Sequence, residues 1–278
     1  NSYSDYSPSL NLLIDKGASL NATDKDGATA LMRAADNDRL PHIRTLVERG
    51  AAIDLKDKNG RNVVHYAVSG WRASTTTLNY LLDRNAPVNE QDVEGRTPVM
   101  LAAWSSGKHA IVSTLLKRYA SNWYTDKSGD GLSHFAVSSG STDTLKALAD
   151  AGVKFDQRDS AGRTALHRAV TGSNLAIVRF LLSHGADVDA RDNEQRSPLH
   201  AAAGNYYDST TTVKILLDAG ADVNAAFKDG GTALSEAIYN DKRPLVEMLL
   251  ARGADIKTAT IWGTPITIHM VHLNKPKV

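Results

Sequence analysis

A glycine recurs through this sequence at intervals close to 33 residues. Its copies are Gly27, Gly60, Gly95, Gly129, Gly162 and Gly230, with Gln195 at the one expected place that lacks glycine. The successive spacings are 33, 35, 34, 33, 33 and 35 residues. A period of this length is typical of chains built from repeated supersecondary units that pack only against their neighbours. The period therefore predicts a solenoid.

Each period contains the start signal of a helix a few residues after the glycine. Thr97 and Ser197 place a hydroxyl at the N-cap position, and Pro98 and Pro198 follow them. Proline is tolerated at the first helical position because its missing N–H would have no partner there. We therefore expect a helix to begin at each of these sites.

The period from 162 to 194 shows that each unit holds two short helices. Gly185 stands after the second apolar stretch, where a left-handed C-terminal cap is expected. The first apolar face consists of Leu166, Ala169 and Val170, and the second of Ile177, Val178, Leu181 and Leu182. Neither helix is long enough to be stable alone, so each must bury its apolar face against neighbouring units.

A motif close to T-P-L-H-x-A follows each glycine, and L-L and G-A pairs follow later in the unit. Its copies include Thr97-Pro98-Val99, Thr164-Ala165-Leu166-His167, Ser197-Pro198-Leu199-His200 and Thr232-Ala233-Leu234. These residues resemble the ankyrin repeat over about residues 10 to 268. The resemblance implies an all-α fold, an ankyrin-repeat solenoid of stacked helix-turn-helix units joined by β-hairpin loops.

The repeats divide the chain into one ankyrin-repeat domain spanning residues 1–278. We expect a half-repeat at 10–26, full repeats at 27–59, 60–94, 95–128, 129–161, 162–194, 195–229 and 230–262, and a C-terminal half-repeat at 263–278. The chain begins at Asn1, and its first recognisable segment is only the second half of a repeat. We therefore expect it to be a fragment of a longer protein.

Composition excludes several function classes. The 32 Lys and Arg residues nearly balance the 31 Asp and Glu residues, and no block of like charge occurs, so we expect neither a nucleic-acid nor a membrane partner. No apolar run approaches the roughly 18 residues that a membrane span needs. The chain has no cysteine, which fits a cytoplasmic or nuclear protein. We expect a monomer in isolation.

Repeat 129–161 departs most from the motif. Ser133 replaces the leucine of T-P-L-H, Ala149 replaces the second leucine of the L-L pair, and Gly131 replaces the capping threonine. Asn122 stands just before it, at a hairpin position that is usually apolar. Because the stability of a solenoid is close to a sum of repeat and nearest-neighbour contributions, we expect the middle of the stack to be weak.

Repeats 60–94 and 195–229 each carry two extra residues between their helices. The insertions end alike, in Ser-Thr-Thr-Thr runs at residues 74–77 and 209–212, and these runs are predicted to cap the second helix. The loops before the runs carry Trp71, Tyr206 and Tyr207, which capping does not require.

Histidines recur at the repeat period and raise the question of a metal site. They are His65, His134, His167 and His200. Successive copies should lie roughly 8–10 Å apart, too far to share one ion. The resemblance implies a structural role, in which each imidazole forms hydrogen bonds across the helix starts. We predict no metal site and no cofactor.

Arginines form a second periodic set directly after the repeat glycine or Gln195. They are Arg61, Arg96, Arg163 and Arg196, and Asp130 interrupts the series. The resemblance implies that they align along the concave groove. Two interpretations stay open: a plain solvated edge, or guanidinium groups that meet carboxylates of a partner.

Aromatic residues stand where the repeat usually has smaller or polar ones. Trp104 follows Ala102-Ala103 at a helix position that faces the groove in similar proteins, Trp123 and Tyr124 lie in a hairpin, and Phe227 replaces a hairpin aspartate. Buried packing is one explanation of these residues. Presentation on a binding surface is the other, because large aromatic side chains dominate interface energetics. With the four arginines, Trp71, Tyr206 and Tyr207, the residues Trp104, Trp123 and Tyr124 make up the predicted protein-binding set.

No catalytic motif is present, since phosphate-binding loops, nucleophile elbows and zinc-protease signatures are all missing from the sequence. We therefore predict a non-enzymatic scaffold that binds another protein on its concave groove. The alternative is an accessory or regulatory region of a larger enzyme, channel or transcription regulator that docks onto the rest of its own chain.

Overall fold

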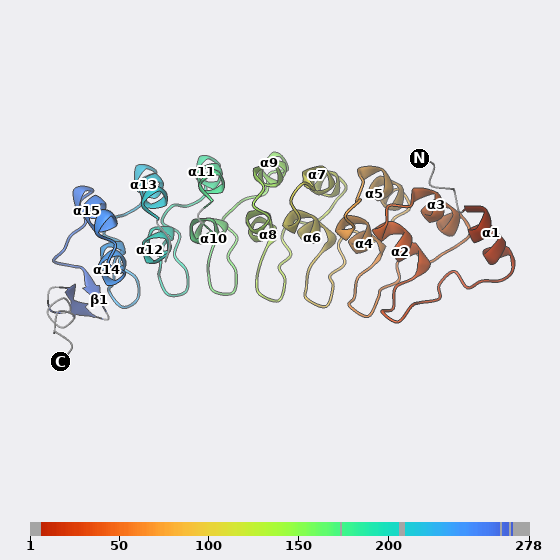
Figure 1. The fold of residues 1–278 in the computed structure, drawn as a ribbon, viewed down its shortest axis with the longest axis horizontal. Coiled ribbons are helices and arrows are strands. Elements are labelled where there is room, and N and C mark those ends of the chain that lie inside the picture. Colours follow the sequence, from red (N-terminus) through yellow and green to blue (C-terminus); the bar gives the residue numbers. More distant parts are fainter. Residues whose placement is uncertain (1–6, 173, 206–208, 262, 267, 269–278) are drawn as a thin grey trace. The chain divides into compact units, whose positions relative to one another are not determined.

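The structure, a computed structural model, describes residues 7–172, 174–205, 209–261, 263–266 and 268. Over these ranges it consists of short helices of seven to nine residues and one pair of two-residue strands. Figure 1 shows the helices in pairs, with a hairpin loop between one pair and the next. The predicted all-α class and helix-turn-helix repeat are confirmed. In the part of the chain described, no helix is both long and apolar enough to traverse a bilayer.

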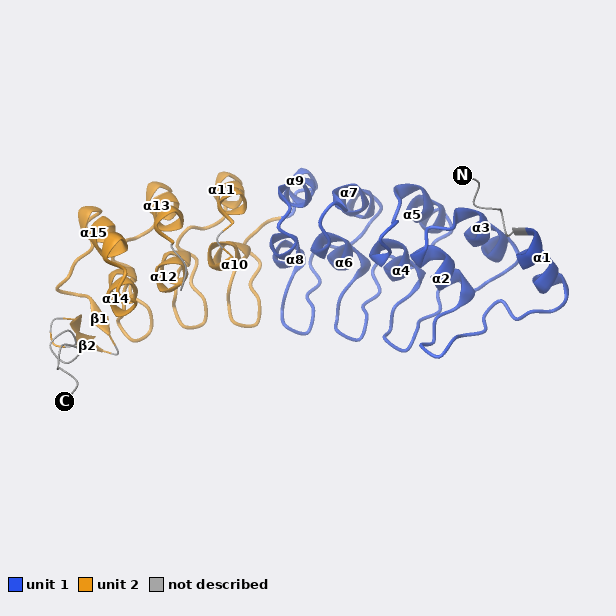
Figure 2. Ribbon diagram, in the orientation of Figure 1, with its two compact units in different colours: residues 1–153 blue, residues 154–278 orange. Residues whose placement is uncertain are grey.

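The chain divides into two compact units, residues 1–153 and 154–278 (Figure 2). Unit 1 contains α1 (Ser7–Asp15), α2 (Ala30–Asp36), α3 (Leu40–Glu48), α4 (Val63–Ser69), α5 (Thr75–Leu82), α6 (Pro98–Trp104), α7 (His109–Lys117), α8 (Leu132–Ser138) and α9 (Thr142–Asp150). The first helices of successive repeats pack in the order α2, α4, α6 and α8. Each also packs against the second helix of its own repeat, which forms the apolar core.

Unit 2 is built in the same way. It contains α10 (Ala165–Thr171), α11 (Leu175–Ser183), α12 (Pro198–Gly204), α13 (Thr210–Asp218), α14 (Ala233–Tyr239), α15 (Arg243–Ala251), β1 (Thr260–Ile261) and β2 (Thr264–Pro265). The first helices α10, α12 and α14 stack on one another, and β1 packs against α14. β1 pairs antiparallel with β2, with Thr260 opposite Pro265. Most of the predicted half-repeat 263–278 lies outside the described residues.

The repeat glycines are explained by their backbone conformation and by a close approach between hairpins. Gly27 has φ +84°, and a Cβ there would lie 2.8 Å from the backbone N of Lys58 in the next hairpin. Gln195 occupies the same position at φ +61°. This left-handed region costs an L-residue roughly 1–2 kcal/mol, so glycine suits the position better.

An aspartate organises six of the hairpins, and it is buried at Asp57, Asp92 and Asp159. Asp57 Oδ1 accepts the backbone N–H groups of Asn59 and Arg61, both at 2.8 Å. Equivalent pairs of bonds occur at Asp24, Asp92, Asp126, Asp159 and Asp192. The second oxygen accepts side-chain donors at Asp57, Asp92 and Asp159.

Histidines near the starts of α4, α10 and α12 link these helices to the backbone of the hairpin segment that follows. The backbone N–H of Asn62 donates to His65 Nδ1 at 3.2 Å, so Nε2 carries the proton and donates to the Arg96 carbonyl oxygen at 3.1 Å. His167 and His200 bind in the same way, with Nε2 contacts of 3.0 Å to the Arg196 carbonyl oxygen and 2.8 Å to the Ala225 carbonyl oxygen. The predicted structural role is confirmed.

The predicted serine caps are confirmed in one insertion and wrong in the other. Ser74 accepts the backbone N–H of Thr77 at 3.2 Å and caps α5. Ser209 makes no such bond at the start of α13. The physical reason lies in the backbone: Ser74 is extended (ψ 148°), as a capping residue should be, whereas Ser209 has ψ 8°.

Each insertion also changes how the first helix of its repeat ends. After α4 and α12 the chain continues in an extended conformation, at ψ 141° for Gly70 and 138° for Asn205. Lys108 of the next repeat donates to the carbonyl oxygens of Val68 and Ser69, at 2.5 and 3.0 Å. Lys242 donates in the same way to the carbonyl oxygens of Ala203 and Asn205. A lysine from the following repeat therefore caps the C-terminus of each helix.

Repeat 129–161 forms its two helices despite its departures from the motif. Ser133 Oγ is buried in α8 and has no hydrogen-bond partner among the described residues. A buried polar group left without a partner costs about 1–3 kcal/mol. The division between the two compact units also falls inside this repeat, between Val153 and Lys154.

Hydrogen exchange should therefore be faster in residues 120–155 than in residues 162–194. The reason is the loss of leucine packing at Ser133 and Ala149, which lowers the free energy of local opening. Exchange measured by mass spectrometry on peptides from the two segments tests the expectation. Stronger protection of the middle repeat would contradict the account of its weakness.

Tyr119 adopts φ +71° directly after α7, where other repeats have Gly50, Gly152 or Gly185. Its side chain is 85% exposed, so little packing is lost on truncation. Tyr119→Gly should raise the free energy of unfolding by about 1 kcal/mol, because glycine adopts this conformation without steric cost. Urea unfolding measures the change. Tyr119→Ala removes the same ring but retains a Cβ, and an equal gain in that variant would contradict the backbone explanation.

Candidate protein-interaction site

In unit 1 a cavity of about 280 Å³ lies between the hairpins and the first helices of repeats 27–59 and 60–94. Hairpin residues Asp57 and Arg61 line one side, and Asp36 and Ser69, the last residues of α2 and α4, line the other. Trp104 is the last residue of α6 and occupies the equivalent position in the next repeat. The groove, defined as the surface between hairpins and first helices, therefore includes the Trp104 position.

The Trp104 side chain packs against a buried aromatic ring and is about half exposed to solvent. Its ring meets Phe135 of α8 edge to face, with centroids 6.3 Å apart and an interplanar angle of 69°. Phe135 is only 7% exposed, whereas Trp104 is 52% exposed. Of the two interpretations left open by the sequence, full burial is wrong for this residue. Half of a large aromatic surface is presented to solvent.

The arginines of unit 1 form ion pairs with this chain's own carboxylate. Arg96 Nη2 lies 2.8 Å from Asp92 Oδ2, and Arg61 Nε lies 3.6 Å from the same oxygen. Burial would raise the pKa of Asp92, but the hydrogen bonds from Arg96 outweigh burial, so this pKa lies below its usual value. Arg96 therefore stabilises a buried anion, while Arg61 is held at a longer distance.

The arginines of unit 2 are likewise paired. Arg163 and Arg168 approach Asp159 Oδ2 at 2.9 and 3.2 Å, and Asp159 is buried. Arg196 Nη2 lies 2.5 Å from Glu236 Oε1 on α14. Asp159 and Arg163 are four residues apart in one hairpin, whereas Arg196 and Glu236 are 40 residues apart, a pairing that the sequence did not reveal.

The remaining predicted residues lie in separate loops. Trp123 is 70% exposed and stacks on Tyr124, with centroids 5.9 Å apart. Trp71 follows α4 and is 79% exposed, and the Arg72 guanidinium lies over its ring at 4.3 Å. Tyr206 and Tyr207 fall outside the described residues. The predicted set therefore does not make a single cluster, even among the residues of unit 1.

Tyr66 is a groove residue that sequence reasoning missed. Its hydroxyl donates to Asp57 Oδ2 at 2.7 Å, and the Arg33 guanidinium lies 5.7 Å from its ring centroid. Burial, together with the neighbouring carboxylate, raises the pKa of Tyr66 to about 12. A sequence signal exists: Tyr66 follows His65 of the helix-start motif, the same register as Arg33, Phe135 and Arg168 in other repeats.

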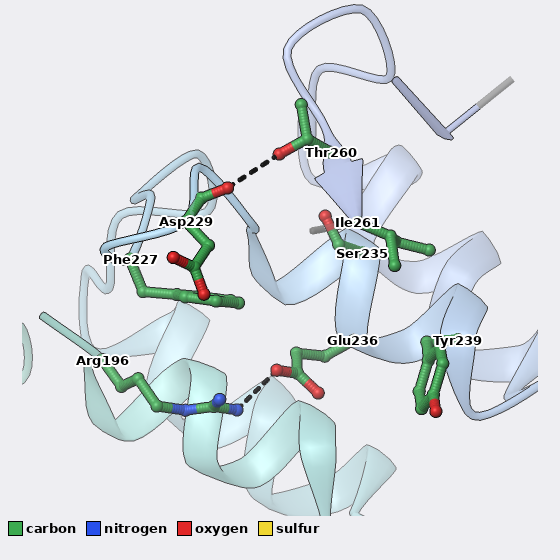
Figure 3. A pocket seen from close by; sticks show the side chains of 8 residues that line it. All are labelled: Arg196, Phe227, Asp229, Ser235, Glu236, Tyr239, Thr260 and Ile261. Atoms are coloured by element: carbon green, nitrogen blue, oxygen red, sulfur yellow. Dashed lines mark hydrogen bonds and ion pairs between the residues drawn. The ribbon is translucent and has the colours of Figure 1, made fainter. Parts of the chain in front are cut away.

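A second cavity, of about 270 Å³, lies in unit 2 between two successive hairpins, α14 and β1 (Figure 3). Arg196 from one hairpin and Phe227 from the next line one side, and Glu236 and Tyr239 of α14 line the other. Tyr239 ends α14 as Trp104 ends α6. The sequence identified Arg196 and Phe227 but not the two helix residues beside them.

Comparison with known proteins identifies the family. A family model described as ankyrin repeats (3 copies) matches residues 2–92, 50–126, 100–192 and 189–260. Among solved structures, the chain is similar to the ankyrin repeat domain of Bcl-3, itself described as a unique member of the IkappaB protein family. That similarity has a TM-score of 0.63 and 29% identity, and it covers 84% of this chain and 90% of the other. Comparison with curated protein sequences gives no match. Because the overlapping matches extend over nearly the whole chain, this protein belongs to the ankyrin-repeat family.

Proposed function

We propose that this chain is a non-catalytic protein-interaction scaffold that binds its partner in the groove. The ankyrin-repeat fold supports the general role of a protein–protein interaction module. The main support for binding in the groove is the position of Trp104. This residue is half exposed at the end of α6, and its ring packs against Phe135. A rigid, partly exposed indole loses little conformational entropy on binding and offers a large contact area, as interface anchors do.

Arg61 is the arginine best placed to assist Trp104. It lines the groove cavity, and its side chain is 34% exposed. Its 3.6 Å approach to Asp92 is longer than the 2.8 Å approach of Arg96. A partner carboxylate is therefore expected to bind Arg61 without displacing the Arg96–Asp92 pair.

A pull-down from cell lysate tests this function when it is run with matched variants. Trp104→Ala alters the groove, and Tyr119→Ala removes an exposed aromatic ring that follows the second helix of the same repeat. We expect a set of proteins captured by the parent and by Tyr119→Ala, and lost with Trp104→Ala. If the Trp104 variant retains every captured protein, the groove is not the binding surface. Loss with the Tyr119 variant alone would assign binding to the second-helix face.

A further inference from the structure

The last hairpin of unit 2 departs from all earlier ones at two positions together. Phe227 replaces the hairpin aspartate, and Gly231 stands where other repeats have Arg61, Arg163 or Arg196. The two changes are sterically linked, because a Cβ on Gly231 would lie 2.3 Å from Cζ of the Phe227 ring. An ion-paired hairpin is thus replaced by one whose inner surface is an aromatic ring.

The Phe227 ring is held in place from two sides. The Arg196 guanidinium lies 4.8 Å from its centroid, and the same arginine is fixed by its 2.5 Å contact with Glu236. The His200 ring meets Phe227 edge to face at 5.3 Å and 85°. A preorganised ring of this kind forms one wall of the 270 Å³ cavity.

The charges of the cavity favour a cation. Figure 3 shows the carboxylate of Asp229, an exposed residue, pointing toward Phe227, and no hydrogen bond or ion pair to this carboxylate is found among the described residues. Glu236 is the second carboxylate, and Arg196 neutralises only one of the two. One negative charge is therefore left unpaired beside an aromatic wall.

The other walls suit an aliphatic stem. Tyr239 is half exposed on α14, and Ile261 of β1 is apolar and buried, and both line the cavity. Lysine and arginine combine an apolar stem with a cationic head, which is attracted both to carboxylates and to the face of an aromatic ring. Cavities for whole small-molecule ligands usually measure about 300–1,000 Å³, so a volume just below that range fits a single side chain.

We infer that this cavity binds one basic side chain, lysine or arginine, of the partner protein. The inference rests on the proposed function, because it specifies the chemistry of the partner at one end of unit 2. An acidic side chain would be repelled by Asp229 and Glu236. A neutral aromatic side chain would leave Asp229 desolvated without a counter-charge, which is unfavourable.

NMR titration of the full ¹⁵N-labelled chain tests the inference without a partner protein. The probes are Nα-acetyl-lysine amide and Nα-acetyl-norleucine amide, which share a linear aliphatic stem and differ in the ammonium group. We expect saturable shifts of the Gly230, Gly231 and Glu236 amides with the lysine probe and at least about threefold weaker binding of the norleucine probe.

Two isosteric variants test whether the affinity for the lysine probe depends on the Asp229 carboxylate. Asp229→Asn removes the unpaired carboxylate and should raise the dissociation constant of the lysine probe about threefold. Asp241→Asn makes the same charge change at an exposed residue outside the cavity and should leave it unchanged. Equal binding of both probes, shifts that do not saturate, or an unaffected Asp229→Asn variant would each overturn the inference.

The outcome is separable from that of the pull-down. Failure of the lysine probe, with partner capture still dependent on Trp104, overturns only the chemistry assigned to this cavity. Specific lysine binding, with capture independent of the groove, overturns the proposed function and leaves the basic-side-chain site in place.

Discussion

Trp104→Ala is expected to weaken partner binding at least about tenfold while the melting transition stays near that of the parent. Interface anchors commonly cost about 2 kcal/mol or more when cut to alanine. A fully buried tryptophan would instead cost roughly 3–5 kcal/mol of fold stability. Trp104 is half exposed, so its truncation removes contact surface for a partner and uncovers only one edge of Phe135.

Isothermal titration with the captured partner and a thermal melt measure the two quantities on the same protein. Trp104→Phe is the matched control, because it keeps a ring against Phe135 and should retain part of the affinity. Arg61→Ala should weaken binding in a salt-dependent way. Unfolding of the Trp104→Ala variant, or unchanged affinity, would remove the main support for the groove.

Acidification from pH 6.5 to pH 4 is expected to destabilise the fold, with His200 contributing about 3 kcal/mol of that loss. Burial lowers the pKa of His200 to about 4, against 6.5 for an ordinary histidine. The unfolded chain therefore binds this proton first as the pH falls. The stabilisation is fully present above about pH 6.5 and is lost progressively down to about pH 4. Burial lowers the pKa values of His65 and His167 in the same direction.

Urea unfolding at closely spaced pH values measures this dependence. His200→Asn should be less stable at pH 7 but have a shallower slope between pH 6.5 and 4. His184→Asn removes an exposed imidazole and is the matched control. The lowered pKa values of Asp92 and Asp159 act below pH 4, because an aspartate with a depressed pKa loses its stabilising effect only on protonation. An unchanged slope in His200→Asn would contradict the assignment.

The repeat period and the helix-start motif predicted the fold well because both are local. A glycine at positive φ, a capping residue and a proline at the first helical position each act within a few residues. The predicted pairs of helices therefore appear even in repeat 129–161, where Ser133 and Gly131 replace favoured residues. The failed Ser209 cap shows the limit: a capping residue needs an extended backbone, and composition does not determine ψ.

The candidate site was less predictable because its contacts join residues far apart in sequence. Arg61 and Arg196 were recognised as periodic, but their carboxylate partners Asp92 and Glu236 come close only when successive hairpins and helices stack. Tyr239 and Glu236 were missed for the same reason, since they line a cavity with residues of the preceding hairpin. Whether Trp71, Trp123 and Tyr124 bind a partner stays a prediction.

The two lysine caps restrict how these repeats can be rearranged. Lys108 and Lys242 each cap the C-terminus of a helix in the preceding, longer repeat. Each longer repeat therefore depends on the repeat that follows it. Deleting residues 95–128 would join repeat 60–94 to a repeat with Ser141 at the position of Lys108, too short to reach the helix end. When repeats are exchanged in protein engineering, the two consecutive repeats that a lysine cap links should therefore be moved together.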